Sequence, residues 1–589
     1  MAEAYKTGNL ADVSWRDMLA QDPYFGLSNS FQYSENINCD DELHGIKLSQ
    51  RVMKIDQWEN SQLITAGERV FIVPQTAGET VKYIDKADDP NQDDAIDDSR
   101  FPWTAPEDTS IVIPTGTTVG EAVVFQDYVW IPISDSTNNQ SYFIKINVYN
   151  ENDVQTYSPI YDHIEDSDES IWNISTLGVT TKFWVMKAGV NQVLNFNNTR
   201  LVCGVGEDLR VYYPELDATW EQQRDPTTQT MRAVVKWETG WKKVQYFEAG
   251  CKIVWLTCDF EYLKVRVTDE GRDTKMYYYP GNNDLRNTFV YNIVDMTGTK
   301  VLRTYNINGV DYFTASLDGS AWYITFNKVI WWTPVQLLTQ RWWLSKYDAN
   351  QKAGYFIWPT TWESKYLDWN FYVGDAYGVF KFKYNPGGYD TGYLKWKIRD
   401  TGEVTIGLCI AWNFVFISDE HGIKAMRLYD TGIDGYEKKG ILISREMEGD
   451  YGGTISKMID EIRLHFELNP LITSSQNAWD IDVYLSPNNS WRNVDPEIDD
   501  TGRWHVIHID WNSNNQNRST RYEKISALNK LDGWSPAFEF DRETITYCVV
   551  IKRWTLPNEG IAQWTPIVRE VNLIYHTKEK TNNILELKN

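Results

Sequence analysis

A repeated hairpin pattern constrains the fold of this chain more than any other feature of its sequence. The clearest copy lies within residues 403–432, where an apolar run, Ile406 to Ile417, is followed by an acidic turn. A second run, Ile423 to Tyr429, comes next, and an Asp-Thr-Gly turn closes the unit. Two β-prone runs joined by a short loop that contains glycine predict a β-hairpin. The first run is apolar almost throughout, so its strand should be covered on both faces, and one hairpin cannot provide that cover.

The same order of apolar strand, turn and second strand recurs earlier in the chain. Strand centres, one per copy, are separated by 59, 73, 52, 59, 59 and 43 residues. A WD40 blade takes about 40–45 residues and a kelch blade about 50, so four-stranded blades with loop insertions account for this spacing. The alternative is a β-rich protein with ordinary hairpins and no symmetry. The pattern favours an all-β, β-propeller-like array of antiparallel hairpins, with centres at Val70, Val129, Val202, Val254, Phe313, Tyr372 and Val415.

Composition agrees with an all-β chain and restricts its partners. At 589 residues the chain is too long for one simple core, and 14% of its residues are aromatic, which suits half-buried pleated surfaces. The net charge is −25, with 82 acidic and 57 basic residues. A surface of this sign repels phosphate backbones, so general nucleic-acid binding is not expected. An acidic channel that repels DNA is compatible with the same charge.

The cysteines and the apolar runs indicate the compartment in which we expect the chain. None of the six cysteines forms a C-x-x-C pair, and several lie inside apolar strand runs, so we expect them to be small core residues. No apolar run approaches the roughly 18 residues of a membrane span, and no apolar segment follows the N-terminus. We therefore expect a soluble chain made in the cytosol without a signal peptide. The cysteines are Cys39, Cys203, Cys251, Cys258, Cys409 and Cys548.

Changes in composition and in the pattern of apolar residues divide the chain into four parts. Residues 1–45 are polar, which predicts either a disordered segment or an N-terminal arm that docks on a neighbouring molecule, and the interspersed aromatics favour the arm. A β-propeller-like repeat region (46–432), a C-terminal β domain (433–577) and a polar tail (578–589) follow. The C-terminal domain alternates apolar and polar residues, as in sheets with one wet face, and reads either as a β-sandwich or as a continuation of the array.

Helical and one-faced segments are expected at a few positions outside the repeats. Short helices are predicted at Trp15 to Ala20 and at Tyr522 to Leu531. The alternation that predicts a wet face is clearest at Glu461 to Leu468 and at Asp480 to Leu485.

Several patterns suggest chemistry, and each has a simpler explanation. The acidic loops Asp88 to Asp98 and Glu165 to Glu169 offer carboxylate oxygens to calcium, but they lack the EF-hand order, and solvated loops look the same. Asp-Thr-Gly is the catalytic triplet of aspartic proteases. Asp and Gly are also the commonest turn residues, and no copy has the expected small residue after the glycine. The triplets lie at residues 390–392, 400–402, 430–432 and 500–502.

The histidine and tryptophan patterns do not predict a metal-binding or ligand-binding site either. His505 and His508 are three apart in a strand pattern, so they face opposite sides and cannot share a zinc ion. Tryptophan-rich segments can stack on sugars or bases, yet in an all-β protein they more often fill a core or a subunit interface. We therefore predict no catalytic, cofactor-binding or metal-binding residues and no cofactor. The tryptophans concerned are Trp331, Trp332, Trp342, Trp343, Trp358, Trp362 and Trp369.

Several segments together resemble a known family. These are NSFQYSENINCDDELHGIKLS (29–49), VGDAYGVFKF (373–382), YDTGIDGYEKKGILISREM (429–447), ISKMIDEIRLHFEL (455–468), IDVYLSPNNSWRNV (481–494) and TPIVREVNLIYH (565–576). Their order resembles the propeller-type tail proteins of tailed bacteriophages, the tail-nozzle or tail tubular protein B-like family. The resemblance covers about the last third of the chain and residues 29–49, and it is one of pattern rather than of a sharp motif. It implies a structural role in the virion and no catalytic residues.

These observations leave three functional hypotheses. The first is a structural, non-enzymatic virion protein that forms a multimeric ring, a nozzle or hub around the DNA exit channel or a platform for fibres. Its partners would be copies of itself, adaptor and fibre proteins, and DNA passing through the channel during ejection. The second is a propeller at the tail tip that binds a host surface glycan and serves attachment. The third is a polysaccharide hydrolase, which would need a pair of carboxylates at a defined separation.

Overall fold

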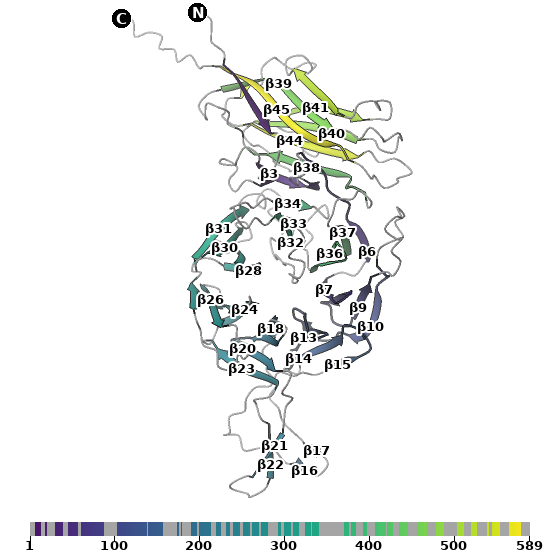
Figure 1. The fold of residues 1–589 in the computed structure, drawn as a ribbon, viewed down its shortest axis with the longest axis vertical. Helices are drawn as coiled ribbons and strands as arrows, with labels where there is room; N and C mark the ends of the chain where they lie inside the picture. The colour runs from purple at the N-terminus through teal and green to yellow at the C-terminus, as the bar shows by residue number, and fades with distance from the viewer. Residues whose placement is uncertain are drawn as a thin grey trace, which may run out of the picture.

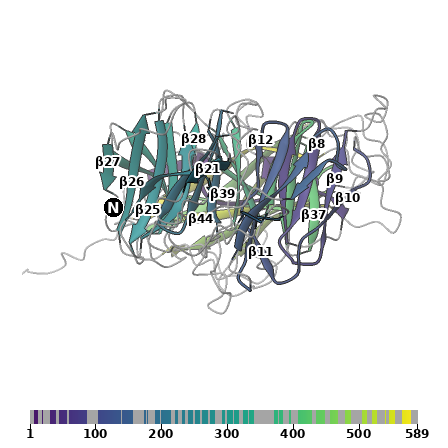
Figure 2. The same ribbon diagram turned by 90° about the horizontal axis from the view of Figure 1, so that it is seen from below.

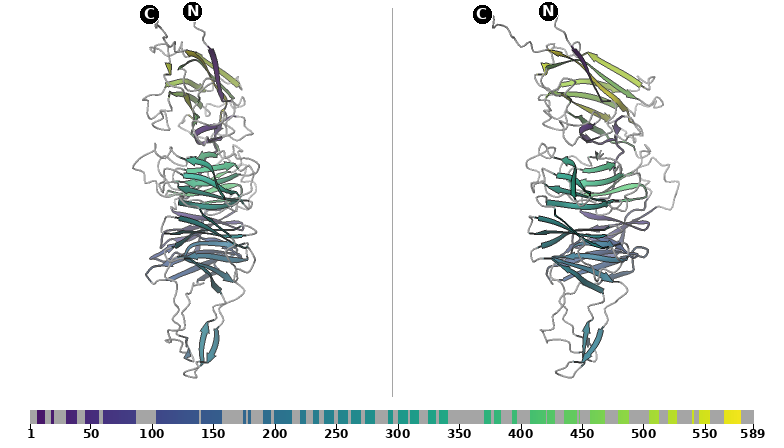
Figure 3. Two further views of the ribbon diagram at one scale, coloured as in Figure 1. Left: turned by 90° about the vertical axis from the view of Figure 1, so that its left-hand side faces the viewer. Right: turned by 60° about the vertical axis from the view of Figure 1, so that its left-hand side comes forward.

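Strands account for all regular structure in the described part of the chain, and they are grouped into a ring and an end domain (Figure 1). In the views of Figure 3 the end domain, the ring and a projecting ribbon follow one another along the longest axis. The computed structural model describes residues 6–12, 18–19, 30–38, 45–56, 60–86, 103–137, 140–156, 174–175, 178–179, 190–196, 199–213, 220–224, 231–235, 240–247, 251–258, 262–269, 273–280, 292–295, 300–307, 310–316, 324–330, 333–340, 370–375, 378–383, 393–396, 407–419, 421–427, 435–445, 447, 456–467, 479–487, 504–511, 520–526, 539–540, 545–553 and 565–578.

The ring contains seven antiparallel sheets within the described ranges, and its strands run across its thickness (Figure 2). The first three sheets are β7–β10 (Ser61–Ala66, Arg69–Pro74, Thr80–Asp85, Glu107–Val112), β11–β15 (Thr117–Val119, Val123–Phe125, Tyr128–Asp135, Gln140–Asn147, Val154–Thr156) and β18, β19, β20 and β23 (Val190–Phe196, Arg200–Val205, Asp208–Tyr213, Gly240–Tyr246). The other four are β24–β27 (Cys251–Cys258, Tyr262–Asp269, Asp273–Pro280, Asn292–Asp295), β28–β31 (Lys300–Ile307, Val310–Ser316, Ile324–Ile330, Thr333–Gln340), β32–β34 (Asn370–Asp375, Gly378–Lys383, Tyr393–Trp396) and β35–β37 with β6 (Gly407–Ala411, Phe414–Asp419, Gly422–Arg427, Met53–Asp56).

The propeller-like array expected from the repeats is confirmed. Each of the seven strand centres proposed from the sequence falls in a different sheet of the ring. The irregular spacing comes from insertions. The hairpin β16–β17 (Ile174–Ser175, Gly178–Val179) lies between the second and third sheets, and the ribbon β21–β22 (Trp220–Arg224, Met231–Val235) lies within the third.

Cores between neighbouring sheets hold the ring together. Alternate residues of a strand point to opposite faces, so one strand can serve two of these cores. In β19, Leu201 and Cys203 pack toward Trp130 of the preceding sheet, whereas Val202 packs toward Ile253 of the following one. This explains why the strand run around Val202 is apolar almost throughout: both faces of β19 are covered.

The apolar run Ile406 to Ile417, which we expected to be one strand, contains two. β35 ends at Ala411, β36 begins at Phe414, and Trp412 and Asn413 form the turn with φ of 49° and 68°. Two consecutive residues with positive φ are what a type I′ hairpin turn requires. Tryptophan does not mark such a turn in sequence, which is why the run looked continuous.

The ring is closed by a strand from the other end of the chain. β6 pairs antiparallel with β37, so Met53 lies opposite Ala425 across the closing sheet. The first and seventh sheets then share a core in which Leu63 and Val70 meet Phe416. The two inner strands approach closely here, since a Cβ on Gly407 would lie 2.6 Å from the carbonyl oxygen of Ser61.

The end domain is sandwich-like and has two sheets. One holds β1 (Lys6–Asp12), β45 (Ile567–Lys578), β39 (Ser456–Glu467), β42 (Thr520–Ser526) and β43 (Glu539–Phe540). The other holds β2 (Met18–Leu19), β3 (Ser30–Glu35), β38 (Lys439–Ser444), β44 (Ile545–Arg553), β40 (Trp479–Pro487) and β41 (Trp504–Trp511). A small hairpin, β4–β5 (Ile37–Asn38, Lys47–Leu48), lies at the base of the domain against β38.

The described strands of residues 1–45, which we expected to form an arm on a neighbouring molecule, belong to this domain instead. β1 pairs with β45, and β3 pairs with β38. The reason is hydrogen bonding: the unpaired edge of each C-terminal sheet is satisfied by a strand from the N-terminus of the same chain. The two helices expected from local signals are also wrong. Met18–Leu19 and Thr520–Ser526 are strands, because pairing with β3 and β39 outweighs local propensity.

Candidate functional site

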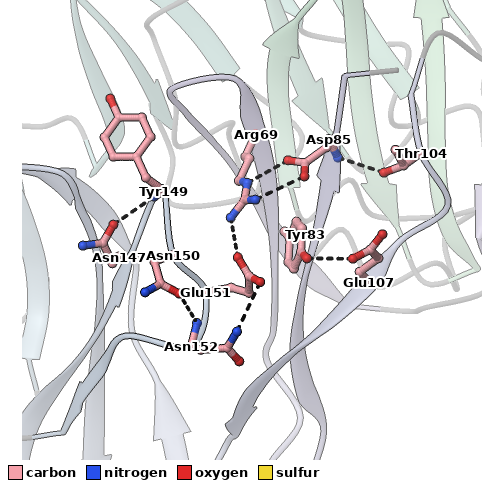
Figure 4. A network of polar contacts seen from close by, with 10 residues as sticks. All are labelled: Arg69, Tyr83, Asp85, Thr104, Glu107, Asn147, Tyr149, Asn150, Glu151 and Asn152. Carbon is pink, nitrogen blue, oxygen red and sulfur yellow. Dashed lines mark hydrogen bonds and ion pairs between the residues drawn. The ribbon is translucent and has the colours of Figure 1, made fainter. Parts of the chain in front are cut away.

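A network of polar side chains joins the first and second sheets of the ring (Figure 4). At its centre is Arg69, which begins β8 just after a turn in which Gly67 has a φ of 60°. Asp85 ends β9, and Glu151 lies in the turn between β14 and β15. Two strand ends and a turn that are far apart in sequence therefore bring one cation and two carboxylates together.

Arg69 uses its planar group on three sides. Its Nε and Nη2 donate to the two carboxylate oxygens of Asp85 at 2.7 and 3.2 Å, and its Nη1 donates to Oε2 of Glu151 at 2.8 Å. The guanidinium also lies over the Tyr83 ring, 4.5 Å from its centroid. Two-point pairing and stacking on an aromatic face are interactions that arginine can make and lysine cannot.

The titration of the neighbouring groups reflects this arrangement. Burial, together with the bond from the Tyr83 hydroxyl to Oε2 of Glu107 at 2.7 Å, raises the pKa of Tyr83 to about 12. The pKa of Glu151 is lowered, first by a bond from its own backbone amide and then by Arg69. Glu151 is therefore a carboxylate at neutral pH and a strong acceptor for Arg69.

The turn that carries Glu151 also presents the most exposed large aromatic side chain in the described residues, Tyr149, which is 70% exposed. Its backbone amide donates to Oδ1 of Asn147, and the amide of Asn152 donates to Oδ1 of Asn150. These bonds hold the turn in shape. Because Arg69 is engaged by two carboxylates and a ring, we interpret the network as a cross-link between blades rather than a site for an anion.

Replacement of Arg69 by Met is expected to lower the free energy of unfolding by about 1–2 kcal/mol, because half-buried carboxylates lose a charged donor. Arg69→Lys should lower the free energy of unfolding by less, since lysine keeps the positive charge and loses only the two-point pairing with Asp85. The difference in the free energy of unfolding between Arg69→Met and wild type should become smaller as the pH falls below about 4.5, the usual pKa of a glutamate. The reason is that the pKa of Glu151 is lowered in the folded protein, so its bond to Arg69 contributes stability only while Glu151 is ionised. Urea unfolding at several pH values measures this.

The matched control uses an ion pair on the surface of the same sheet. Lys82 lies 3.3 Å from Asp108, whose side chain is largely exposed, so Lys82→Met should change stability by less than about 0.5 kcal/mol. Equal losses in Arg69→Met and Lys82→Met would show that the network contributes nothing beyond surface charge.

A second cluster lies on β40, the strand whose polar residues we expected to face water. Asp480 and Asp482 are only 2% and 1% exposed, so the expected wet face is wrong here. β40 pairs with β44 along one edge and with β41 along the other, and its residues 479–486 are all buried. The alternation was read correctly as a strand pattern, but it did not reveal that charged partners bury the polar face.

The partners of these carboxylates come from both neighbouring strands. Oδ1 of Asp482 lies 2.7 Å from Nδ1 of His508 on β41, and Oδ2 lies 3.1 Å from Nζ of Lys552 on β44. Lys552 also lies 3.9 Å from Oδ2 of Asp480. His508 is 48% exposed, so a buried carboxylate orients an imidazole at the surface. Such a pair can position a proton donor or acceptor, and it equally satisfies a buried charge.

Buried ion pairs recur inside the ring. Lys424 bonds to Asp419 at the acidic turn of the last hairpin, and Asp419 Oδ1 also accepts the amide of His421. In the third sheet, Nη2 of Arg210 donates to Oδ2 of Asp208 at 3.0 Å. Each pair is local to one blade. Their placement indicates roles in shaping turns and strands.

The structure places few of the residues that the sequence singled out. His508 lies in the cluster just described, and His505 is three residues away on the same strand. The described ranges contain no group of three or more His, Cys, Asp or Glu residues placed to hold a metal ion. The four Asp-Thr-Gly triplets, both acidic loops and the seven tryptophans lie outside the described residues.

Sequence reasoning missed Arg69, Asp85, Glu151 and the Asp482 cluster. No local motif marks the first group, because Arg69 and Asp85 lie at the ends of two strands and Glu151 lies in a turn of the next sheet. For the second, the signal was present in the alternation of Asp480, Asp482 and their apolar neighbours. The alternation did not indicate which strands lie beside β40 in the sheet.

Within the same described part, no helix has the length and apolarity of a membrane span.

Comparison with known proteins identifies no family. No family model matches the chain, and no curated protein matches it. Among solved structures, virginiamycin B lyase from Staphylococcus aureus is 10% identical and covers 64% of this chain and 98% of its own, with a TM-score of 0.35. BamB from Moraxella catarrhalis is 10% identical over 68% and 98% of the two chains, with a TM-score of 0.31. YCF48 bound to D1 peptide is 8% identical over 64% and 96%, with a TM-score of 0.35. At these scores the likeness supports no statement about function.

Proposed function

We propose that this protein is a structural subunit of a multi-subunit assembly, and that the assembly is a bacteriophage tail. The observation that carries the proposal is the ribbon β21–β22, which projects from the ring on the side opposite the end domain (Figures 1 and 3). It is inserted between two adjacent strands of one blade, β20 and β23, whose own pairing is complete without it. A blade does not need such an insertion to fold.

The ribbon has the character of an interaction element. A two-stranded hairpin is at best marginally stable by itself in water. The register places Trp220 opposite Val235 and Gln222 opposite Ala233, so these four residues belong to one face of the ribbon. Three of these four residues are apolar, and a projecting ribbon of this composition is suited to a groove or sheet edge of another subunit.

The rest of the molecule supports a scaffold role. The ring is closed by β6, and the end domain combines both termini through β1 and β45. Both arrangements pair strands that are far apart in the sequence, and this pairing holds the ring and the end domain closed. The tail identity draws on the resemblance of residues 29–49 and of the last third of the chain to tail-nozzle proteins. In such an assembly a net charge of −25 suits a wall past which DNA must slide without sticking.

The ribbon gives this proposal a direct test. Replacing residues 214–239 by a short Gly-Ser linker should leave the ring folded, since β20 and β23 still pair, and should abolish incorporation into particles. Assembly is measured by light scattering of the purified protein and by imaging of particles produced with the variant chain. Wild type should form a ring of several copies at the tail.

Two further variants sharpen the test. The double substitution Trp220→Ser with Val235→Ser removes one apolar cross-strand pair and keeps the ribbon length, so reduced incorporation would assign the effect to that face. Glu221→Gln on the other face is the control and should assemble normally. A ribbon-less chain that enters particles as well as wild type would refute the interaction role. A monomer found inside intact particles would refute the multimeric ring.

A further inference from the structure

Two short segments connect the end domain with the ring in the described part of the chain. The chain leaves the N-terminal strands through residues 49–52 and enters β6, and it returns through residues 435–437, which lead from β37 to β38. These two segments, which we call the neck, lie side by side. The amide of Arg51 donates to the carbonyl of Gly435 at 3.0 Å, and the amide of Glu437 donates to the carbonyl of Ser49 at 3.0 Å. Gln50 and Tyr436 form the bridge between these two bonds.

The neck is tied firmly at both ends. On the side of the end domain, the amide of Ser49 donates to the carbonyl of Asn36 at 2.9 Å, and Nδ2 of Asn36 donates to the carbonyl of Lys439 at 3.1 Å. On the side of the ring, β6 and β37 are paired strands of the closing sheet. The neck is therefore hydrogen-bonded to the end domain and continuous with the closing sheet of the ring.

A titratable side chain completes the neck. Oε1 of Glu437 accepts the backbone amide of Val52 at 2.9 Å, which adds a third bond across the two segments. Burial raises the pKa of Glu437 to about 7, and Glu35 acts in the same direction. The amide of Val52 and the charge of Arg51 oppose this rise and do not overcome it. The other described charges at the neck are Lys438, whose backbone amide also bonds Glu437, and Lys47, which lies over the Tyr436 ring.

We propose that the neck is a proton-sensitive joint: while Glu437 is protonated the two segments stay paired, and its ionisation loosens the end domain from the ring. The direction follows from linkage. A carboxyl group that titrates higher in the closed neck than in water favours the closed form below its usual pKa of 4.5, and this contribution is lost as the pH rises through about 7. The inference is independent of the proposed tail function.

Hydrogen exchange on the full-length protein tests the joint. Peptides that cover residues 49–52 and 435–437 should lose protection between pH 5.5 and pH 8.5, after correction for intrinsic exchange rates. The rise from 4.5 to about 7 sets an upper limit of about 30-fold over this pH range, because a carboxyl group with a pKa of 4.5 in the open neck is already mostly ionised at pH 5.5. Because Glu437 is only half-buried, we expect a loss of about 3- to 10-fold. Peptides from the β44 core should change much less over the same range.

Substitutions separate titration from mere structure. Glu437→Gln keeps an oxygen for the Val52 amide and cannot ionise, so protection of its neck should be independent of pH. Arg51→Met removes a cation that favours the ionised form and should move the opening to higher pH. Glu35→Gln removes a like charge and should move it to lower pH. Glu79→Gln, at an exposed position of the ring, removes the same charge elsewhere and is the control.

Wild-type protection that does not change with pH overturns the joint, whatever the variants do. An unchanged pH dependence in Glu437→Gln assigns the effect to another group and also overturns it. If Glu437→Gln fails to fold, the opposite shifts of Arg51→Met and Glu35→Gln support the joint, and shifts of the same sign refute it.

Discussion

A protein that lacks residues 1–45 is expected to lose its end domain while the ring remains folded. The deletion removes β1 from its pairing with β45 and removes β3 from β38. It also removes Phe31 and Ile37, both 0% exposed. Loss of one such aromatic alone costs about 3–5 kcal/mol, and two unpaired sheet edges add to this. The loss therefore approaches the whole stability of a typical domain, about 5–15 kcal/mol.

Limited proteolysis and hydrogen exchange measure this outcome separately in the two bodies. Peptides from β39, β44 and β45 should lose protection, whereas ring peptides such as those of β8 and β13 should keep it. Deletion of residues 1–5, which ends just before β1, is the matched control and should change neither. A chain of residues 46–589 with a fully protected end domain would restore the original interpretation of this segment as a separate arm.

Replacement of Trp103 by Ala should have the second largest effect, at the seam where the ring closes. Trp103 is 6% exposed and meets Phe414 and Phe416 of the seventh sheet in edge contacts, with ring centroids 4.9 and 5.2 Å apart. The substitution removes a large buried side chain and the aromatic pairs that join the first blade to the last. We expect a loss of about 3–5 kcal/mol in the free energy of unfolding, measured by denaturant unfolding.

An exposed aromatic of the same ring provides the comparison. Tyr149→Ala removes a large ring that is 70% exposed and should change stability by less than about 0.5 kcal/mol. Trp103→Phe should recover part of the loss, because it keeps an edge contact. A cost for Trp103→Ala no greater than that for Tyr149→Ala would show that the seam does not limit the stability of the ring.

The candidate sites differ in how far local sequence reveals them. The pattern around Asp480 and Asp482 identifies a strand, because side chains alternate with a period of two. It does not identify His508 and Lys552 as the partners that bury the carboxylates, since those come from the two flanking strands. Arg69, Asp85 and Glu151 have no common motif, and Glu151 reaches Arg69 from a different blade.

The neck shows the same division more strongly. Nothing near Glu437 in the sequence predicts a raised pKa, because the residues that surround it include Val52 and Glu35, nearly four hundred positions away. Burial by distant segments is a tertiary property, and so is the resulting shift. The same applies to Trp412 and Asn413, where a turn interrupts an apolar run because the paired strands require it.

The sequence by itself determined the all-β class and a propeller-like array, because both depend on local periodicity and on the recurrence of hairpins. Its seven strand centres each lie in a separate sheet. Only the tertiary structure decided which segments complete the sheets: β6 closes the ring, and β1 and β3 complete the end domain. The reason is that an edge strand is chosen by unpaired backbone groups on a distant partner, and local side-chain patterns carry no record of that partner.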